Sequence, residues 1–132
     1  MPDNRPELPK NGEPDEIVRG SAERAPTVDL AATLRRLRGS HKLLRELIGF
    51  YNADYPALLA RLDKGIEERN TKEAKTATHK LHGLAASFDG QIAAALAMMV
   101  ETLVDNQEFA EAARTLPALK RSLNDVRDAL QS

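Results

Sequence analysis

Apolar side chains recur every three or four residues between Leu30 and Leu130, which is the spacing of amphipathic helices. The longest stripe predicts one helix that begins after Ser40, a residue type that favours helix N-termini, and bends at Pro56. Its members are Leu44, Leu47, Ile48, Tyr51, Tyr55, Leu58, Leu59, Leu62 and Ile66. Because the period-2 alternation of strands is absent, the sequence predicts an all-α fold.

Four further helices are predicted by the same spacing. A short leading helix ends at Gly39, and Asn70 followed by Glu73 resembles the start of a helix that we expect to end near residues 88–90. The inward positions expected in these four helices are Leu30, Leu34 and Leu37, then Ala74, Ala77, Leu81, Leu84, Ala85 and Phe88, then Ile92, Leu96, Met99 and Leu103, then Phe109, Ala112, Leu116, Leu119, Leu123, Val126 and Leu130. Met98 is also expected in the core. Short connections make neighbouring helices antiparallel, so we predict an antiparallel four-helix bundle with a short leading helix.

Residues 1–26 differ from the rest of the chain. They contain five of its seven prolines, interspersed charges and few large apolar side chains. Such a segment cannot offset its ordering entropy by burial. We therefore expect a disordered N-terminal arm or linker over residues 1–26 and the folded bundle over residues 27–132.

The composition of the chain disfavours several classes of function. A chain of 132 residues has room for one domain, and its net charge of −1 offers no field for nucleic acid or an anionic membrane. It has no cysteine, and its longest apolar run, at residues 92–100, is too short to span a bilayer. No basic and apolar leader opens the sequence. We expect a cytoplasmic protein that binds neither nucleic acid nor a membrane.

The candidate chemistry lies on the helix after Asn70, where two histidines are three residues apart. With a helical step of about 100° per residue, His79 points roughly 170° from the mean apolar direction and His82 roughly 110° from it. His79 is thus expected outside and His82 at the boundary. Gly83 and Ala86 follow on the side of His79. Because a mid-helix glycine costs about 1 kcal/mol relative to alanine, we interpret these two small residues as a docking surface for a macromolecule.

Several chemistries are open to such a histidine. A solvent-exposed imidazole is largely neutral near pH 7 and can act as a nucleophile, for example toward a phosphoryl group. Cations to support that group would come from Lys75, Lys80 and His82. A metal site is disfavoured because two histidines lack the third and fourth ligands that zinc requires. A hydrolytic site is disfavoured because a helix exterior does not exclude water. A pure interaction module remains the alternative.

The segment His79-Lys80-Leu81-His82-Gly83 resembles the H-x-L-K-G motif of histidine-containing phosphotransfer (HPt) domains, and the resemblance extends over about residues 28–131. It implies that His79 accepts a phosphoryl group from the aspartyl phosphate of a receiver domain and passes it to another receiver. It also implies a phosphocarrier rather than an enzyme, with no cofactor of its own and with Mg²⁺ on the receiver. The implied partners are response-regulator receivers and a hybrid sensor histidine kinase, and the implied state is a monomer.

Two positions depart from the pattern of that family. His82 stands where the family has lysine, so a fixed positive charge is replaced by one that depends on pH. Glycine stands at position 90, whereas the family usually has it one position earlier, where this chain has Asp89. The first departure leaves open a second hypothesis, a degenerate HPt bundle that binds partners without carrying phosphate.

Overall fold

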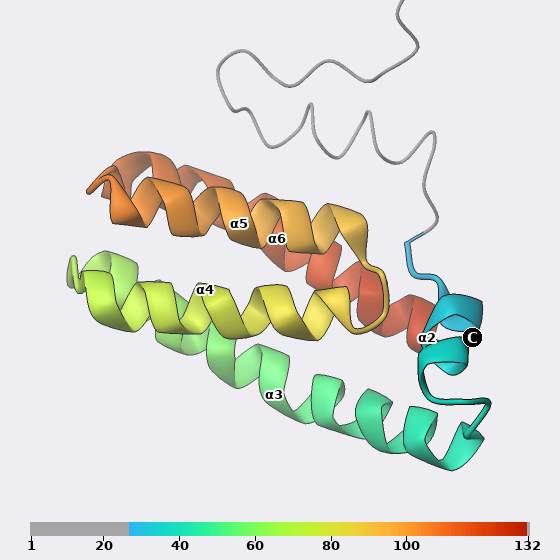
Figure 1. Ribbon diagram of the computed structural model, residues 1–132. Coiled ribbons are helices and arrows are strands. Elements are labelled where there is room, and N and C mark those ends of the chain that lie inside the picture. The colour runs from blue at the N-terminus through green and yellow to red at the C-terminus, as the bar shows by residue number, and fades with distance from the viewer. Residues whose placement is uncertain (1–26, 132) are drawn as a thin grey trace, which may run out of the picture.

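The computed structural model describes residues 27–131, and this part of the chain contains five helices and no strand. The helices are α2 (Leu30–Arg36), α3 (His41–Glu67), α4 (Thr71–Ala86), α5 (Gln91–Asp105) and α6 (Phe109–Leu130). Helices α3 to α6 run antiparallel to one another as a bundle, and α2 lies at one end of it (Figure 1). The predicted all-α bundle with a short leading helix is confirmed. The expected arm, residues 1–26, lies outside the described residues.

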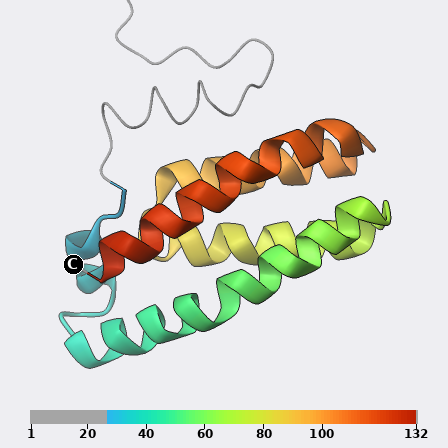
Figure 2. The same ribbon diagram turned by 180° about the vertical axis from the view of Figure 1, so that it is seen from behind.

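The four long helices form a ring in which each packs against two neighbours. Helix α4 contacts α3 and α5, and α6 closes the ring by contacting α5 and α3. Seen from behind, α3 and α6 lie in front of α4 and α5 (Figure 2). One side of the molecule is therefore made by α4 and α5, the two helices that carry the candidate site.

Tyr51 ties three helices together in the core. Its ring stacks on Tyr55 with a centroid separation of 4.7 Å and meets Phe88 edge-on at 5.8 Å. Its hydroxyl donates a hydrogen bond of 2.6 Å to the backbone carbonyl of Leu123 on α6. Burial raises the pKa of Tyr51 far above its ordinary value of 10. These contacts fix the N-terminal half of α3 against α6 and the end of α4.

The predicted helix starts are confirmed by their capping bonds. The side chain of Ser40 accepts a hydrogen bond of 3.2 Å from the backbone N–H of Leu43. The side chain of Asn70 accepts one of 3.2 Å from the backbone N–H of Glu73. Helix α3 continues without interruption through Pro56. Each cap satisfies a backbone donor that would otherwise be left unpaired at a helix start.

The end of α4 lies earlier than the sequence predicts, at Ala86, and a turn follows. Asp89 in this turn has a φ of 54°, so it takes the left-handed conformation at the position where the HPt pattern has glycine. Aspartate is one of the few side chains that visit this region. Gly90 meets a different demand, because a Cβ built there would lie 3.2 Å from the carbonyl of Ala85 and 3.2 Å from a methyl of Val126.

Helix α2 is fastened to this same turn. The hydroxyl of Thr33 donates to the carbonyl of Ser87 at 3.1 Å, and Arg36 donates to that carbonyl at 2.9 Å. Arg36 also forms an ion pair of 3.1 Å with Asp89. The backbone N–H of Asp29 donates to the carbonyl of Phe88 at 2.9 Å. The leading helix therefore holds the α4–α5 connection from outside the ring.

The inward face of α5 differs from the predicted one. Its buried residues are Ala93, Leu96, Ala97, Val100 and Val104. Ile92 and Leu103 pack only partly against the core, and the expected core residue Met98 is 53% exposed. Apolar residues cover most of the circumference of α5, so their spacing does not indicate which face of this helix is buried. In the structure Leu96 faces the ring as predicted, together with two alanines and two valines: Ala93, Ala97, Val100 and Val104.

Candidate functional site

The outward face of α4 presents His79. The opposite face of the helix is buried through Ala74, Ala77, Leu81 and Ala85. The His79 side chain is 79% exposed, as its angular position predicts. His82 is half-buried beside it. The apolar face of α4 is buried in the core, and the opposite face therefore exposes the imidazole of His79 to solvent.

Gly83 and Ala86 are both exposed on this face. A Cβ built on Gly83 would meet nothing within 4 Å. Close packing of two helices therefore does not explain this glycine. The backbone of α4 is bare to solvent one turn after His79, as the docking-surface interpretation requires.

Helix α5 adds a carboxylate that the sequence interpretation missed. Oε2 of Glu101 lies 3.9 Å from Nδ1 of His79, and the Glu101 side chain is 31% exposed. This distance is an ion-pair distance for a protonated imidazole and is longer than a hydrogen bond. The sequence of α4 does not indicate that Glu101 lies beside His79, because this contact depends on how α4 and α5 align.

A second contact joins the same helices one turn away. Nζ of Lys75 and Oδ1 of Asp105 are 2.8 Å apart. The hydrogen bond to Asp105 and the charge of Asp105 raise the pKa of Lys75, and the charge of Glu101 adds to this effect. Lys75, expected as a cation near His79, is therefore already paired. Lys80, the other expected lysine, is exposed.

The two contacts fix the alignment of α4 and α5. Lys75 lies opposite Asp105, and His79 lies opposite Glu101. Because the helices are antiparallel, each step of four residues toward the C-terminus of α4 corresponds to a step of four residues toward the N-terminus of α5. Continued by one turn, this alignment sets Met98 level with the backbone around Gly83. Met98 is one of the large apolar side chains that remain exposed. The face around His79 is thus charged on one side and apolar on the other.

The charged side contains a shallow depression of about 300 Å³, lined by Lys75, Glu101, Thr102 and Asp105. Within the described part of the chain, no group of three or more histidine, cysteine, aspartate or glutamate side chains is arranged to hold a metal ion. The site is therefore an open surface with one histidine at its centre and a cation–carboxylate pair beside it.

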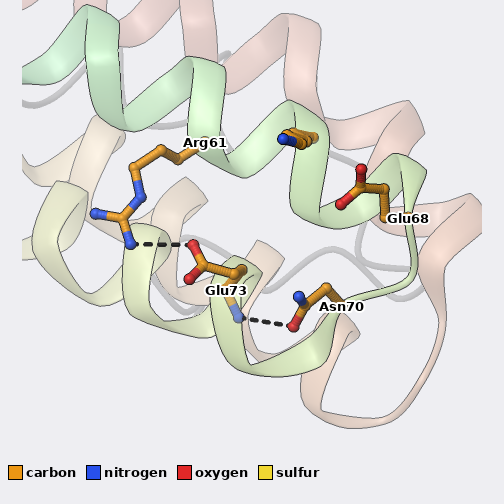
Figure 3. Close-up of a pocket in the computed structure, with 5 residues that line it drawn as sticks. Arg61, Glu68, Asn70 and Glu73 are labelled. Carbon is orange, nitrogen blue, oxygen red and sulfur yellow. Dashed lines mark hydrogen bonds and ion pairs between the residues drawn. The ribbon is translucent and has the colours of Figure 1, made fainter.

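A second depression, of about 390 Å³, lies where α3 meets the start of α4 (Figure 3). Arg61 and Glu73 lie within it and form an ion pair of 3.0 Å, and the side chain of Asn70 points to the backbone of Glu73, which it caps. Glu68 also lines the depression and lies apart from this pair. The contacts of this depression serve the α3–α4 turn, and it contains no histidine.

No helix among residues 27–131 is both long enough and apolar enough to cross a membrane. The longest, α3, carries charged side chains along its whole length.

The comparison with protein families matches residues 46–129 to the Hpt domain. The matched range contains all of α4 and α5, and so both cross-helix contacts, together with most of α3 and α6. Searches of curated proteins and of solved structures gave no significant match.

Proposed function

The chain belongs to the Hpt domain family, whose members are phosphocarriers in two-component phosphorelays, and we propose that its own phosphoryl carrier is His79. In this proposal His79 takes the phosphoryl group from the aspartyl phosphate of one receiver domain and gives it to another receiver. The observation that supports it best is the 79% exposure of His79 beside the bare backbone of Gly83. A receiver must bring its aspartate within bonding distance of the imidazole, and this is the part of α4 that leaves room for it.

The transfer needs little from this chain besides the nucleophile. The lone pair of His79 Nε2 attacks the phosphorus, the P–N bond forms, and the P–O bond to the aspartate breaks. The electron pair of that bond leaves with the aspartate, which becomes a free carboxylate. The imidazole keeps its proton on Nδ1, so no proton has to leave, and the reverse steps deliver the phosphoryl group to a second receiver. The catalytic acidic residues and Mg²⁺ are expected on the receiver.

Glu101 supports this assignment of the two ring nitrogens. It faces Nδ1 of His79 at 3.9 Å and attracts a proton to that atom. A proton on Nδ1 leaves the lone pair on Nε2, which is the tautomer that attack requires. We therefore expect the negative charge of Glu101 to favour the tautomer whose free lone pair is on Nε2.

Electrostatic support is expected from Lys75, Lys80 and His82. Lys75 lies one turn before His79 on the same face and within side-chain reach of it. His82 lies three residues after it and can donate a hydrogen bond to a phosphoryl oxygen.

Docking is expected around Gly83, Ala86 and Met98. All three are exposed, Met98 by 53%, and the alignment of α4 and α5 predicts that they lie together on the uncharged side of the His79 face. Removal of an exposed methionine from water would contribute to binding, and the absence of side chains at Gly83 lets a partner helix approach the backbone.

A degenerate bundle is the second candidate, because one feature favours it. The phosphoryl group on His79 would stand near two carboxylates, Glu101 and Asp105, while the lysine of the motif is His82 in this chain. A protein with this charge balance could bind receivers and carry no phosphate.

The deciding experiment mixes the protein with a phosphorylated receiver and Mg²⁺ and follows alkali-stable label and intact mass. We expect one phosphoryl group on the wild type and on His82→Gln, and none on His79→Gln. Label lost only in His82→Gln would mean that His82 is the acceptor. A folded wild type that binds receivers and stays unlabelled would favour the degenerate bundle.

A further inference from the structure

Four side chains form two neighbouring cross-helix pairs between α4 and α5. Lys75 and Asp105 form one pair at 2.8 Å, and His79 and Glu101 form the next at 3.9 Å. On each helix the two members are four residues apart, which places their side chains one above the other. The hydrogen bond to Asp105 and its charge raise the pKa of Lys75, and the charge of Glu101 adds a smaller effect in the same direction.

We propose that Asp105 is a positioning residue that holds Lys75 in the unphosphorylated protein, and that Lys75 changes partner to the phosphoryl group once His79 carries it. This inference rests on the proposed function of His79. It assigns to Asp105 a regulatory effect: the strength of its hold on Lys75 sets how far the transfer equilibrium favours phospho-His79 over the receiver.

The negative charges around a phosphorylated His79 favour such a change of partner by Lys75. A phosphoryl group brings about two negative charges to a surface that already contains Glu101 and Asp105. Lys75 starts one turn from His79, and its flexible four-carbon stem lets the ammonium reach either Asp105 or a group on the imidazole. Its present bond to Asp105 is exposed on both sides, with 42% of the Lys75 side chain and 60% of the Asp105 side chain accessible. Exposed pairs of this kind are weak, so a new and more highly charged partner can displace the old one.

Lys80 is less suited to this role, although it is closer in sequence. A step of about 100° per residue turns its side chain away from α5 and toward the α3 side of the helix. Glu73 on that same side reaches Arg61 of α3. His79 and Lys75 instead lie on the α5 side, as their contacts show.

The experiment measures the equilibrium constant for phosphoryl transfer between a receiver and this protein. Four forms are compared: wild type, Asp105→Asn, Lys75→Gln and the double variant. We expect Asp105→Asn to raise the phospho-His79 fraction relative to phosphoreceiver by roughly two- to fivefold, and Lys75→Gln to lower it by a similar factor. In the Lys75→Gln background, the effect of Asp105→Asn is expected to be much smaller, because Asp105 acts mainly through Lys75. Lys75→Arg, which keeps the cation, is expected to stay close to wild type.

A matched control exists on the other side of the ring. Asp63 on α3 pairs with Lys120 on α6 at 3.0 Å with similar exposure, away from the α4–α5 face. Asp63→Asn is therefore expected to leave the equilibrium unchanged.

Three results would overturn the inference. If Asp105→Asn has the same effect with and without Lys75, Asp105 acts by simple repulsion. If Asp105→Asn has no effect in the otherwise wild-type protein, Asp105 does not hold Lys75 in reserve. Both results leave the role of His79 intact, because the wild type is still labelled. A wild type that takes no label would overturn the proposed function and this inference with it.

Discussion

Nδ1 of His79 and Oε2 of Glu101 lie 3.9 Å apart across the interface of α4 and α5, so a carboxylate from another helix lies beside the candidate nucleophile. Glu101→Gln keeps the size of the side chain and removes its charge. We expect phosphorylation of His79 to slow by roughly two- to fivefold, the effect of one exposed charge contact, with the helical content unchanged. Stopped-flow or quenched-flow transfer from a phosphorylated receiver measures the rate. An unchanged rate would show that the ring needs no orienting carboxylate.

A substitution at Gly83 is expected to change protein stability and the phosphoryl-transfer rate in opposite directions. Gly83→Ala removes a mid-helix glycine at a site where the new methyl meets nothing within 4 Å, so the free energy of unfolding is expected to rise by about 1 kcal/mol. Transfer is expected to slow, since the methyl stands where a partner helix approaches.

Gly49 on α3 provides the control for Gly83. It is also exposed within a helix and also has nothing within 4 Å of a built Cβ. Gly49→Ala is expected to stabilise the protein by a similar amount and to leave the transfer rate unaltered. Urea denaturation gives the stabilities. Equal transfer rates in the two variants would remove Gly83 from the docking surface.

Gly65 has the opposite environment on the same helix, α3. A Cβ built there would lie 2.9 Å from the backbone nitrogen of Ala74 on α4. Overpacking of this kind costs about 1–3 kcal/mol and outweighs the gain of about 1 kcal/mol in helix propensity. We therefore expect Gly65→Ala to lower the free energy of unfolding by up to about 2 kcal/mol. Urea denaturation beside Gly49→Ala tests this, and a stabilised Gly65→Ala would contradict the close packing of α3 and α4.

The prediction of this fold from sequence succeeded mainly where the signal is local, although α4 ends at Ala86, earlier than predicted. The caps at Ser40 and Asn70 and the outward direction of His79 follow from residue type and helical spacing, and the structure agrees. The orientation of α5 did not follow, because alanines and larger apolar residues surround that helix and Met98 is exposed. Glu101 could not be placed beside His79 for a related reason. Their contact depends on the alignment of two helices, and only packing sets that alignment.

Tyr51 makes stability depend on pH in the alkaline range. Its pKa is raised in the folded protein, so its contribution is complete below the unfolded value of about 10 and is lost as the pH rises above that value. Tyr51→Phe removes this dependence and also the bond to the carbonyl of Leu123, and we expect it to cost about 1–2 kcal/mol near pH 7.

The measurement for Tyr51 is the difference in unfolding free energy between wild type and Tyr51→Phe across pH 8–11. The difference is expected to shrink as the pH rises above about 10, whereas other groups that titrate there affect both proteins alike. A difference that stays constant or widens with pH would contradict the assignment of a raised pKa to Tyr51.

Long-range ¹H–¹⁵N NMR of the phosphorylated, ¹⁵N-labelled protein tests most directly whether the phosphoryl group resides on Nε2 of His79. We expect the ¹⁵N shift of one ring nitrogen, Nε2 of His79, to move to the value of a phosphorylated imidazole, while Nδ1 keeps its proton toward Glu101 and the ring of His82 stays unphosphorylated. A phosphorylated signal from His82, or from Nδ1 of His79, would contradict the account.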